Sequence, residues 1–159
     1  NQVNQKVKNV KVVSIEEGPM PSVELDMTNC YAEGLVKSVR RKIWILDKNR
    51  VAIRDSIEGE SVESVSYTWH GHPDGYNYVN NWGLVQHEEG ILWFRCIGRS
   101  FSPSNMTRLR GSRGSLSFSR FLPKPSAPIW WVFTSKETEI DVPTQNADGS
   151  LVWGNDTLK

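Results

Sequence analysis

The stretch SYTWHGHPDG, residues 66–75, has residue types and spacing that could bind a metal ion. His70 and His72 are two residues apart, so on a strand both imidazoles would point to one face and could bind one ion. Asp74 could add an oxygen ligand after the bend at Pro73. The alternative is a turn, in which Pro73 sets the backbone angles and Asp74 accepts a hydrogen bond from its own backbone. We favour the turn, with the histidines in a structural or ligand-contacting role.

A second group of candidate residues lies in SFSPSNMTRLRGSRG, residues 100–114, which is polar and basic. Guanidinium groups bind sulfate and carboxylate groups in a planar, bidentate manner. Arg108, Arg110 and Arg113 are therefore our candidates for contacts with an anionic sugar. His70 and Tyr76 are further candidates for the same role.

Aromatic residues are unusually frequent, because seven of the 159 residues are Trp. Exposed Trp and Tyr rings stack on the apolar faces of sugars, whereas buried rings pack between sheets. Both uses stay open for four residues near expected strand ends, namely Tyr76, Tyr78, Trp82 and Trp93. Trp130 and Trp131 lie in an entirely apolar run, and we expect them in the core.

Charge is distributed unevenly along the chain although the net charge is only +1. No acidic residue occurs between Glu89 and Glu137, a stretch that carries eight Lys and Arg residues. This asymmetry indicates an anionic partner near the second half, or ion pairs with acids of the first half across a sheet. The low net charge argues against a nucleic-acid partner.

The usual catalytic signatures are missing from the sequence. It has no Gly-x-Ser-x-Gly motif, and Glu58, Glu60 and Glu63 are typical of a solvated edge rather than of a glycosidase pair. Cys30 and Cys96 lack metal-site spacing and leave the redox compartment undecided, and Cys96 is expected in the core. No apolar run is long enough to span a membrane, and no signal-peptide pattern is present.

Alternation of apolar and polar residues with a period of two dominates the sequence, which predicts strands and no substantial helix. The segment 128–135 is apolar on both faces and predicts a central strand covered on both sides. In the segment 36–47, alternation places Val39, Ile43 and Ile45 on one face and Arg40, Lys42 and Trp44 on the other. The other expected strands lie at 8–15, 22–28, 51–57, 61–71, 83–86, 91–98 and 115–122.

These elements predict an all-β protein, an antiparallel two-sheet β-sandwich. We expect a single domain over residues 1–159 with a weakly patterned tail, 136–159, that contains one short strand around Val152. Because the sequence begins with Asn, we expect it to be a fragment of a larger multidomain protein.

The stretch VELDMTNCYAEGLVKSVRRKIWILDKNRVAIRDSIEG resembles the C-terminal β region of heparinase II/III-like polysaccharide lyases. The resemblance covers roughly residues 20–135 and includes the strands from VSYTWHGHP to WWVFT. The matching pieces are Asp26, Thr28, Tyr31, Arg40, Arg41, Asp55 and Gly59.

The resemblance implies a partner domain, since lyases of this family join an α/α-toroid with a catalytic Tyr and His to a β region. It also implies zinc in the parent enzyme. The family's His-x-His-x-Asp element precedes the matched region, whereas His70, His72 and Asp74 follow it. We therefore assign no catalytic residue, cofactor or metal to this chain, with that triad kept as the alternative metal site.

The resulting hypothesis is a non-catalytic β-domain that supports the catalytic toroid and helps bind a uronic-acid polysaccharide cleaved by β-elimination. The resemblance further implies a periplasmic or secreted protein. Two other hypotheses stay open, a stand-alone carbohydrate-binding module and a purely structural or protein-interaction β-sandwich.

Overall fold

Short turns between alternating segments make antiparallel neighbours of strands that are adjacent in sequence. In the computed structural model, β1 (Lys11–Glu16), β2 (Ser22–Asp26), β3 (Ser38–Ile45) and β4 (Arg50–Glu58) pair in this order. The turn before β4 is stabilised by Asp47, whose Oδ1 accepts a hydrogen bond from the Asn49 amide at 2.7 Å. The stretch DKNR, residues 47–50, thus joins β3 and β4 in an antiparallel hairpin.

The structure describes residues 10–60, 62–71, 76–79, 82–87, 90–97, 106–107, 116–123, 127–136 and 142–159. For residues 66, 68–71, 76–79, 87, 106–107 and 116–123 it describes the backbone alone.

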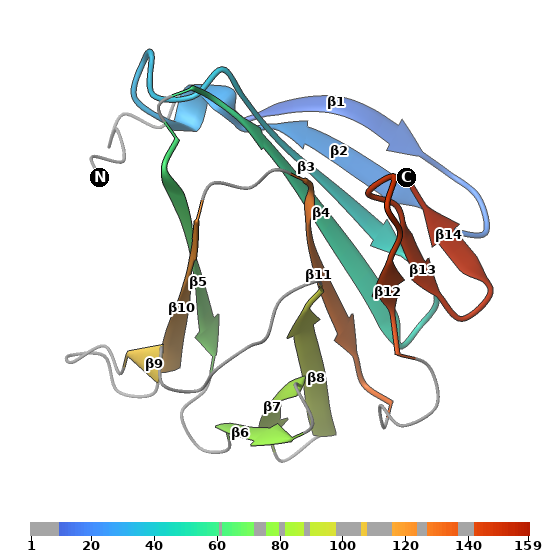
Figure 1. Ribbon diagram of the computed structural model, residues 1–159. Helices are drawn as coiled ribbons and strands as arrows, with labels where there is room; N and C mark the ends of the chain where they lie inside the picture. Colours follow the sequence, from blue (N-terminus) through green and yellow to red (C-terminus); the bar gives the residue numbers. More distant parts are fainter. Residues whose placement is uncertain are drawn as a thin grey trace.

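Eight strands form one large antiparallel sheet in the order β1-β2-β3-β4-β11-β8-β7-β6 (Figure 1). Its second half consists of β6 (Tyr76–Val79), β7 (Trp82–His87), β8 (Gly90–Cys96) and β11 (Ile129–Thr134). β11 enters between β4 and β8, so the strand that is most apolar in sequence becomes central.

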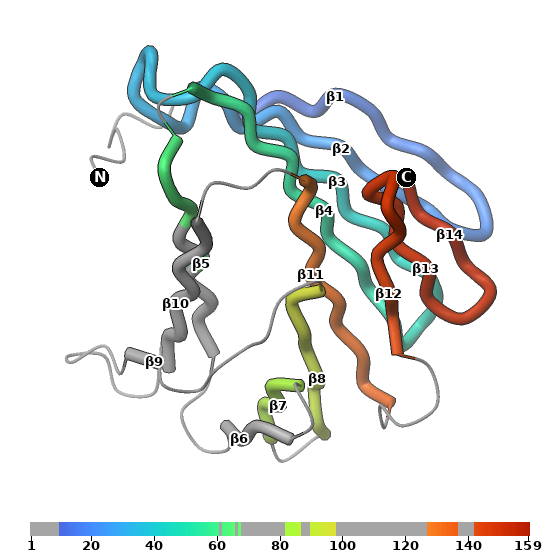
Figure 2. Tube along the Cα trace, in the orientation of Figure 1, coloured from blue at the N-terminus to red at the C-terminus, as the bar shows by residue number. Residues whose placement is uncertain are grey.

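Two small sheets accompany the large one. β5 (Ser64–Gly71), β10 (Leu116–Pro123) and β9 (Met106–Thr107) form the first, in the order β5-β10-β9. β12 (Thr144–Gln145), β13 (Leu151–Trp153) and β14 (Asp156–Leu158) form the second. Figure 2 shows the red β12–β14 unit on one side of β11 and β5 on the other. The all-β antiparallel sandwich expected from the sequence is confirmed, and the third sheet is an addition.

The large sheet packs on both of its faces. We call the face that carries Ile53, Phe94 and Trp131 the inner face, and it packs against Tyr67 of β5. The opposite, outer face packs against β13 and β14, and its core contains Trp44, Ala52, Trp82, Trp130, Val132, Leu151, Trp153 and Leu158. Trp130, Trp131 and Val132 are fully buried, so the doubly covered strand is confirmed.

The faces predicted for β3 are confirmed, because Val39, Ile43 and Ile45 share the inner face while Lys42 and Trp44 share the outer one. Trp44 is buried because β13 and β14 pack on the outer face, whereas Ile45 is 51% exposed. Two other sequence expectations need correction. The tail contains three short strands rather than one. The strand expected over 22–28 ends at Asp26, because a 3-10 turn, η1 (Thr28–Cys30), follows it.

Gly83 in β7 marks the tightest packing within the inner face. It lies opposite Phe94 of β8, and an added Cβ would be 2.7 Å from Phe94 Cε1 and Cε2 and closer still to Cζ. The aromatic ring therefore occupies the space that a side chain would need.

We predict that Gly83→Ala lowers the free energy of unfolding by about 1–3 kcal/mol, because Phe94 must leave its buried position. Urea unfolding measures this loss. The matched control is Gln86→Ala, an exposed position of the same strand, for which the change should stay within about 0.5 kcal/mol. Equal losses in the two variants would contradict the packing described.

Candidate functional site

The predicted anion-binding arginines, Arg108, Arg110 and Arg113, lie outside the residues that the structure describes. Their role stays a prediction. The same holds for His72 and Asp74 of the alternative metal triad.

His70 and Tyr76 lie on strands of different sheets. The backbone of His70 is in β5, opposite Ser117 of β10, and that of Tyr76 is in β6, opposite Val85 of β7. Their side chains are not among those described. Within the described part of the chain, no group of three His, Cys, Asp or Glu residues is placed to hold a metal ion.

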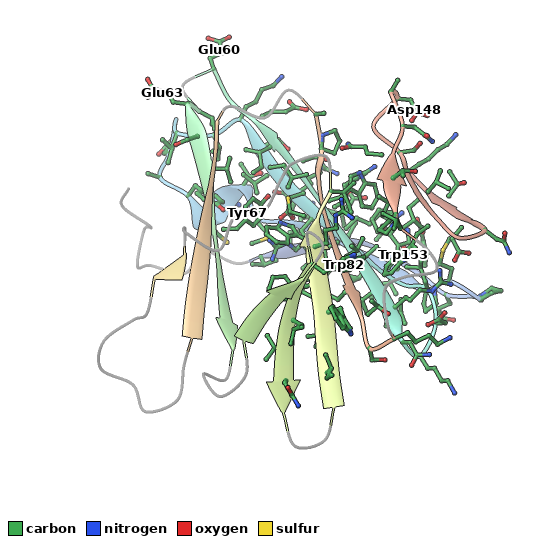
Figure 3. The ribbon with its side chains drawn as sticks, turned by 60° about the horizontal axis from the view of Figure 1, so that its bottom comes forward. Glu60, Glu63, Tyr67, Trp82, Asp148 and Trp153 are labelled. Carbon is green, nitrogen blue, oxygen red and sulfur yellow. The ribbon has the colours of Figure 1, made fainter. Side chains whose placement is uncertain are left out.

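The aromatic candidates for sugar stacking, Trp82 and Trp93, differ in how deeply they are buried. Trp82 is only 2% exposed and belongs to the outer-face core, so packing and not stacking is its role (labelled in Figure 3). Trp93 is half-buried against the same core. Cys96 is buried opposite Trp131, as expected.

A buried ion pair joins β3 to β4 on the inner face. Arg41 donates from Nε to Asp55 Oδ1 at 2.7 Å and from Nη2 to Oδ2 at 2.8 Å. The Asp55 side chain is only 4% exposed, and its hydrogen bonds raise the pKa of Arg41 further above its ordinary value. A bidentate pair of this kind holds two strands in one register, and removing one partner would leave a buried charge.

Two tyrosines lie beside this pair. Burial, and then the negative charge of Asp55, raises the pKa of Tyr67, whose buried hydroxyl has no well-formed hydrogen bond within the described residues. Tyr31, which follows η1, has its pKa raised by the same two causes in the same order. The surroundings of both phenols therefore favour the neutral form.

The residues that carry the sequence resemblance all make structural contacts. Asp26 Oδ1 accepts a hydrogen bond from the Thr28 amide at 2.9 Å, and the Thr28 hydroxyl accepts one from the Val39 amide at 3.0 Å. At Gly59, an added Cβ would lie 2.8 Å from Val62 Cγ2 and 3.3 Å from the carbonyl oxygen of Leu35. The matched motif thus connects η1 to β3 and closes the edge of β4.

The outer face carries cations over Trp rings. Lys42 Nζ lies 5.1 Å from the centroid of Trp44, and the guanidinium carbon of Arg54 lies 5.7 Å from the same centroid. Arg54 also lies 5.9 Å from the centroid of Trp130. Sequence alternation placed Lys42 and Trp44 on one face, but Arg54 was not singled out because its neighbours come from other strands.

Comparison with solved structures gives clear matches. The mutant form of heparan sulfate lyase HepC from Pedobacter heparinus matches with a TM-score of 0.68 at 11% identity, over 94% of this chain and 27% of that one. HepC itself gives 0.63 at 10%, with the same coverage, and a heparinase III gives 0.59 at 13%, over 93% and 26%. The chain has the fold of a part of these lyases.

This lyase fold is shown by structure and not by sequence. No protein-family model matches the chain, and no curated protein sequence matches it. The chain spans about a quarter of the length of the matched lyases. Among the described residues, no helix has the length and apolar character needed to cross a membrane.

We predict that Asp55→Ala, which removes the carboxylate of the Arg41–Asp55 pair, lowers the free energy of unfolding by about 3–5 kcal/mol. The control is Glu24→Ala, which breaks the Arg40–Glu24 pair (3.2 Å), in which the Arg40 side chain is 46% exposed. That loss should stay below about 1 kcal/mol. Chemical unfolding of both variants measures the difference, and similar losses would show that the Arg41–Asp55 pair has no special structural role.

Proposed function

We propose that residues 1–159 are the non-catalytic β-domain of a heparinase II/III-like polysaccharide lyase. The fold carries the proposal, because the likeness covers 94% of this chain and only 27% of HepC. The 159 residues match about one quarter of such a lyase, so they do not include a counterpart of the rest of that enzyme. Base and acid for β-elimination would then come from a separate catalytic domain of the same polypeptide.

An uncovered apolar surface supports the proposed attachment to another domain. On the inner face of β1, β2 and β3, Val12, Ile15 and Ile45 are 53%, 70% and 51% exposed. Register places Ile15 beside Val23 and Val23 beside Ile43, so the apolar side chains continue across three strands. We call this surface the open apolar face: Val12, Ile15, Val23, Leu25, Ile43 and Ile45.

The same three strands are charged on their outer side. Lys42 Nζ donates to Glu16 at 2.9 Å, and Arg40 donates to Glu24 at 3.2 Å. This end of the sheet therefore has one charged side and one apolar side, and an exposed apolar surface of this kind is typical of an interaction surface. We assign the open apolar face to the helical catalytic domain, because about three quarters of the chain of each matched lyase lies outside the shared fold.

The second part of the proposal is contact with an anionic polysaccharide. Arg108, Arg110 and Arg113 would bind the carboxylate or sulfate groups, with His70 and Tyr76 as further contacts. In the whole enzyme, neutralisation of the uronate carboxylate makes the C5 proton removable by a base. Zinc would belong to the parent enzyme, and we derive no step through it for this chain. Such an enzyme would act in the periplasm or outside the cell.

We predict that the 159-residue chain binds heparan sulfate or alginate oligosaccharides at low salt without cleaving them. Calorimetric titration measures binding, and the unsaturated uronate product would reveal cleavage. Arg110→Ala and Arg113→Ala should each weaken binding by roughly tenfold, as loss of a charge-assisted contact does. The control is Lys37→Ala, which removes an exposed positive charge that pairs with Glu58 at 3.5 Å. This variant should change the affinity less than about twofold.

Three results would contradict parts of this proposal. Absence of binding at low salt would remove the polysaccharide role and leave a structural or protein-interaction sandwich. Binding unaffected by the arginine variants would remove those residues from the site. Tight binding by a protein whose gene encodes no further domain would instead favour a stand-alone carbohydrate-binding module.

A further inference from the structure

We infer that Lys42 and Arg54, on the outer face, form an anion site that binds a carboxylate or sulfate group of a sugar chain. The inference rests on the proposed function only in taking the anion to belong to a polysaccharide. The site lies on the opposite side of the sheet from the open apolar face.

The first observation is a like-charge pair across two strands. Lys42 of β3 and Arg54 of β4 are direct register partners, and both contact the ring of Trp44. Like charges directly opposite each other destabilise a sheet unless an anion compensates them. The only carboxylate that pairs with either within the described residues is Glu16, which accepts from Lys42 at 2.9 and 3.0 Å.

The second observation is the state of Arg54 itself. Arg40, Arg41 and Arg50 each pair with a carboxylate, Glu24, Asp55 and Asp47 respectively. Within the described part of the chain, Arg54 has no such partner and is half-buried. Arg95, over Trp82, also lacks one, but its Nε is buried and no second cation adjoins it in the register.

The third observation is that the guanidinium of Arg54 is held in place before any ligand arrives. It lies over Trp44 and Trp130, which are almost completely buried, so both rings are immobile supports. A planar guanidinium held on aromatic rings loses little conformational freedom when it binds an oxyanion in a bidentate manner. Lys42 would add a point charge beside it, which suits a carboxylate or a sulfate.

The position of the site has a consequence for the whole enzyme. Because Lys42 and Arg54 are on the outer face, a domain docked on the inner face would not cover them. They would hold the polysaccharide at a distance from the reaction and so act as an auxiliary binding site rather than as part of the catalytic cleft.

The test is a titration of the 159-residue chain, followed through the side-chain Nε resonances of its arginines. Inorganic sulfate and acetate are the first probes, and a sulfated and a non-sulfated uronate oligosaccharide are the second, which separates sulfate from carboxylate recognition. We expect the Arg54 resonance to shift with at least one probe of each pair. Arg54→Gln should weaken oligosaccharide binding about tenfold, and Arg54→Lys, which keeps the charge but not the bidentate geometry, by several-fold.

The matched control is Arg40→Gln, which removes the same charge from the same face of the neighbouring strand, where Glu24 already pairs with it. It should weaken binding less than about twofold. Oligosaccharide binding that Arg54→Gln and Arg40→Gln weaken equally would overturn the inference and leave the proposed function standing. Absence of binding by the unsubstituted chain would overturn both, while an unmoved Arg54 resonance with normal binding would overturn only this site.

Discussion

Burial of β11 on both of its faces is the constraint on which the rest of this structure depends. Trp130, Trp131 and Val132 are excluded from water, so the large sheet needs one layer on each side. A Trp side chain buries about 150–250 Å², which at about 25 cal/mol per Å² corresponds to an upper bound of about 4–6 kcal/mol. One such ring therefore contributes an amount comparable with the entire net stability of an ordinary domain. Tyr67 covers the inner side, and Trp153 with its neighbours covers the outer side.

The layers formed by β5 and by β12–β14 cover only part of the large sheet. The inner face of β1, β2 and β3 keeps exposed apolar residues. The Arg41–Asp55 pair lies at the boundary on the inner face, since Arg41 adjoins Leu25 of the open apolar face and Asp55 adjoins buried Ile129. On one side of this boundary the sheet is closed by β5, and on the other its apolar side chains are exposed. The outer face carries Lys42 and Arg54 over the ring of Trp44, with Glu16 paired to Lys42.

Much of this architecture could be predicted from local patterns. The apolar run of β11 indicated cover on both faces, and the alternation in β3 and β4 with an Asp at the turn indicated their hairpin. Alternation assigned Trp44 and Ile45 to the correct faces, but it does not reveal whether a face is covered, so the burial of Trp44 and the exposure of Ile45 could not be predicted. The strands β12–β14 are two or three residues long, too short for a period of two to be recognised.

The candidate sites were predictable only in part, for a related reason. The resemblance motif was found in the sequence, yet the cross-strand contacts of Asp26, Thr28 and Arg41 show that it has a structural role. Arg54 was missed because its importance depends on Lys42 and on Trp130, which lie on the two neighbouring strands. Register, not sequence distance, brings these residues together.

The central claim is that the open apolar face is where the rest of a longer lyase docks. Hydroxyl-radical labelling of Ile15 and Ile45, compared between the intact gene product and the 159-residue chain, tests it directly. Val142, which is 52% exposed and lies outside that face, is the internal reference. The account predicts strong labelling of Ile15 and Ile45 in the short chain and several-fold weaker labelling in the intact protein, with Val142 unchanged. Equal labelling of Ile15 and Ile45 in both proteins would contradict it.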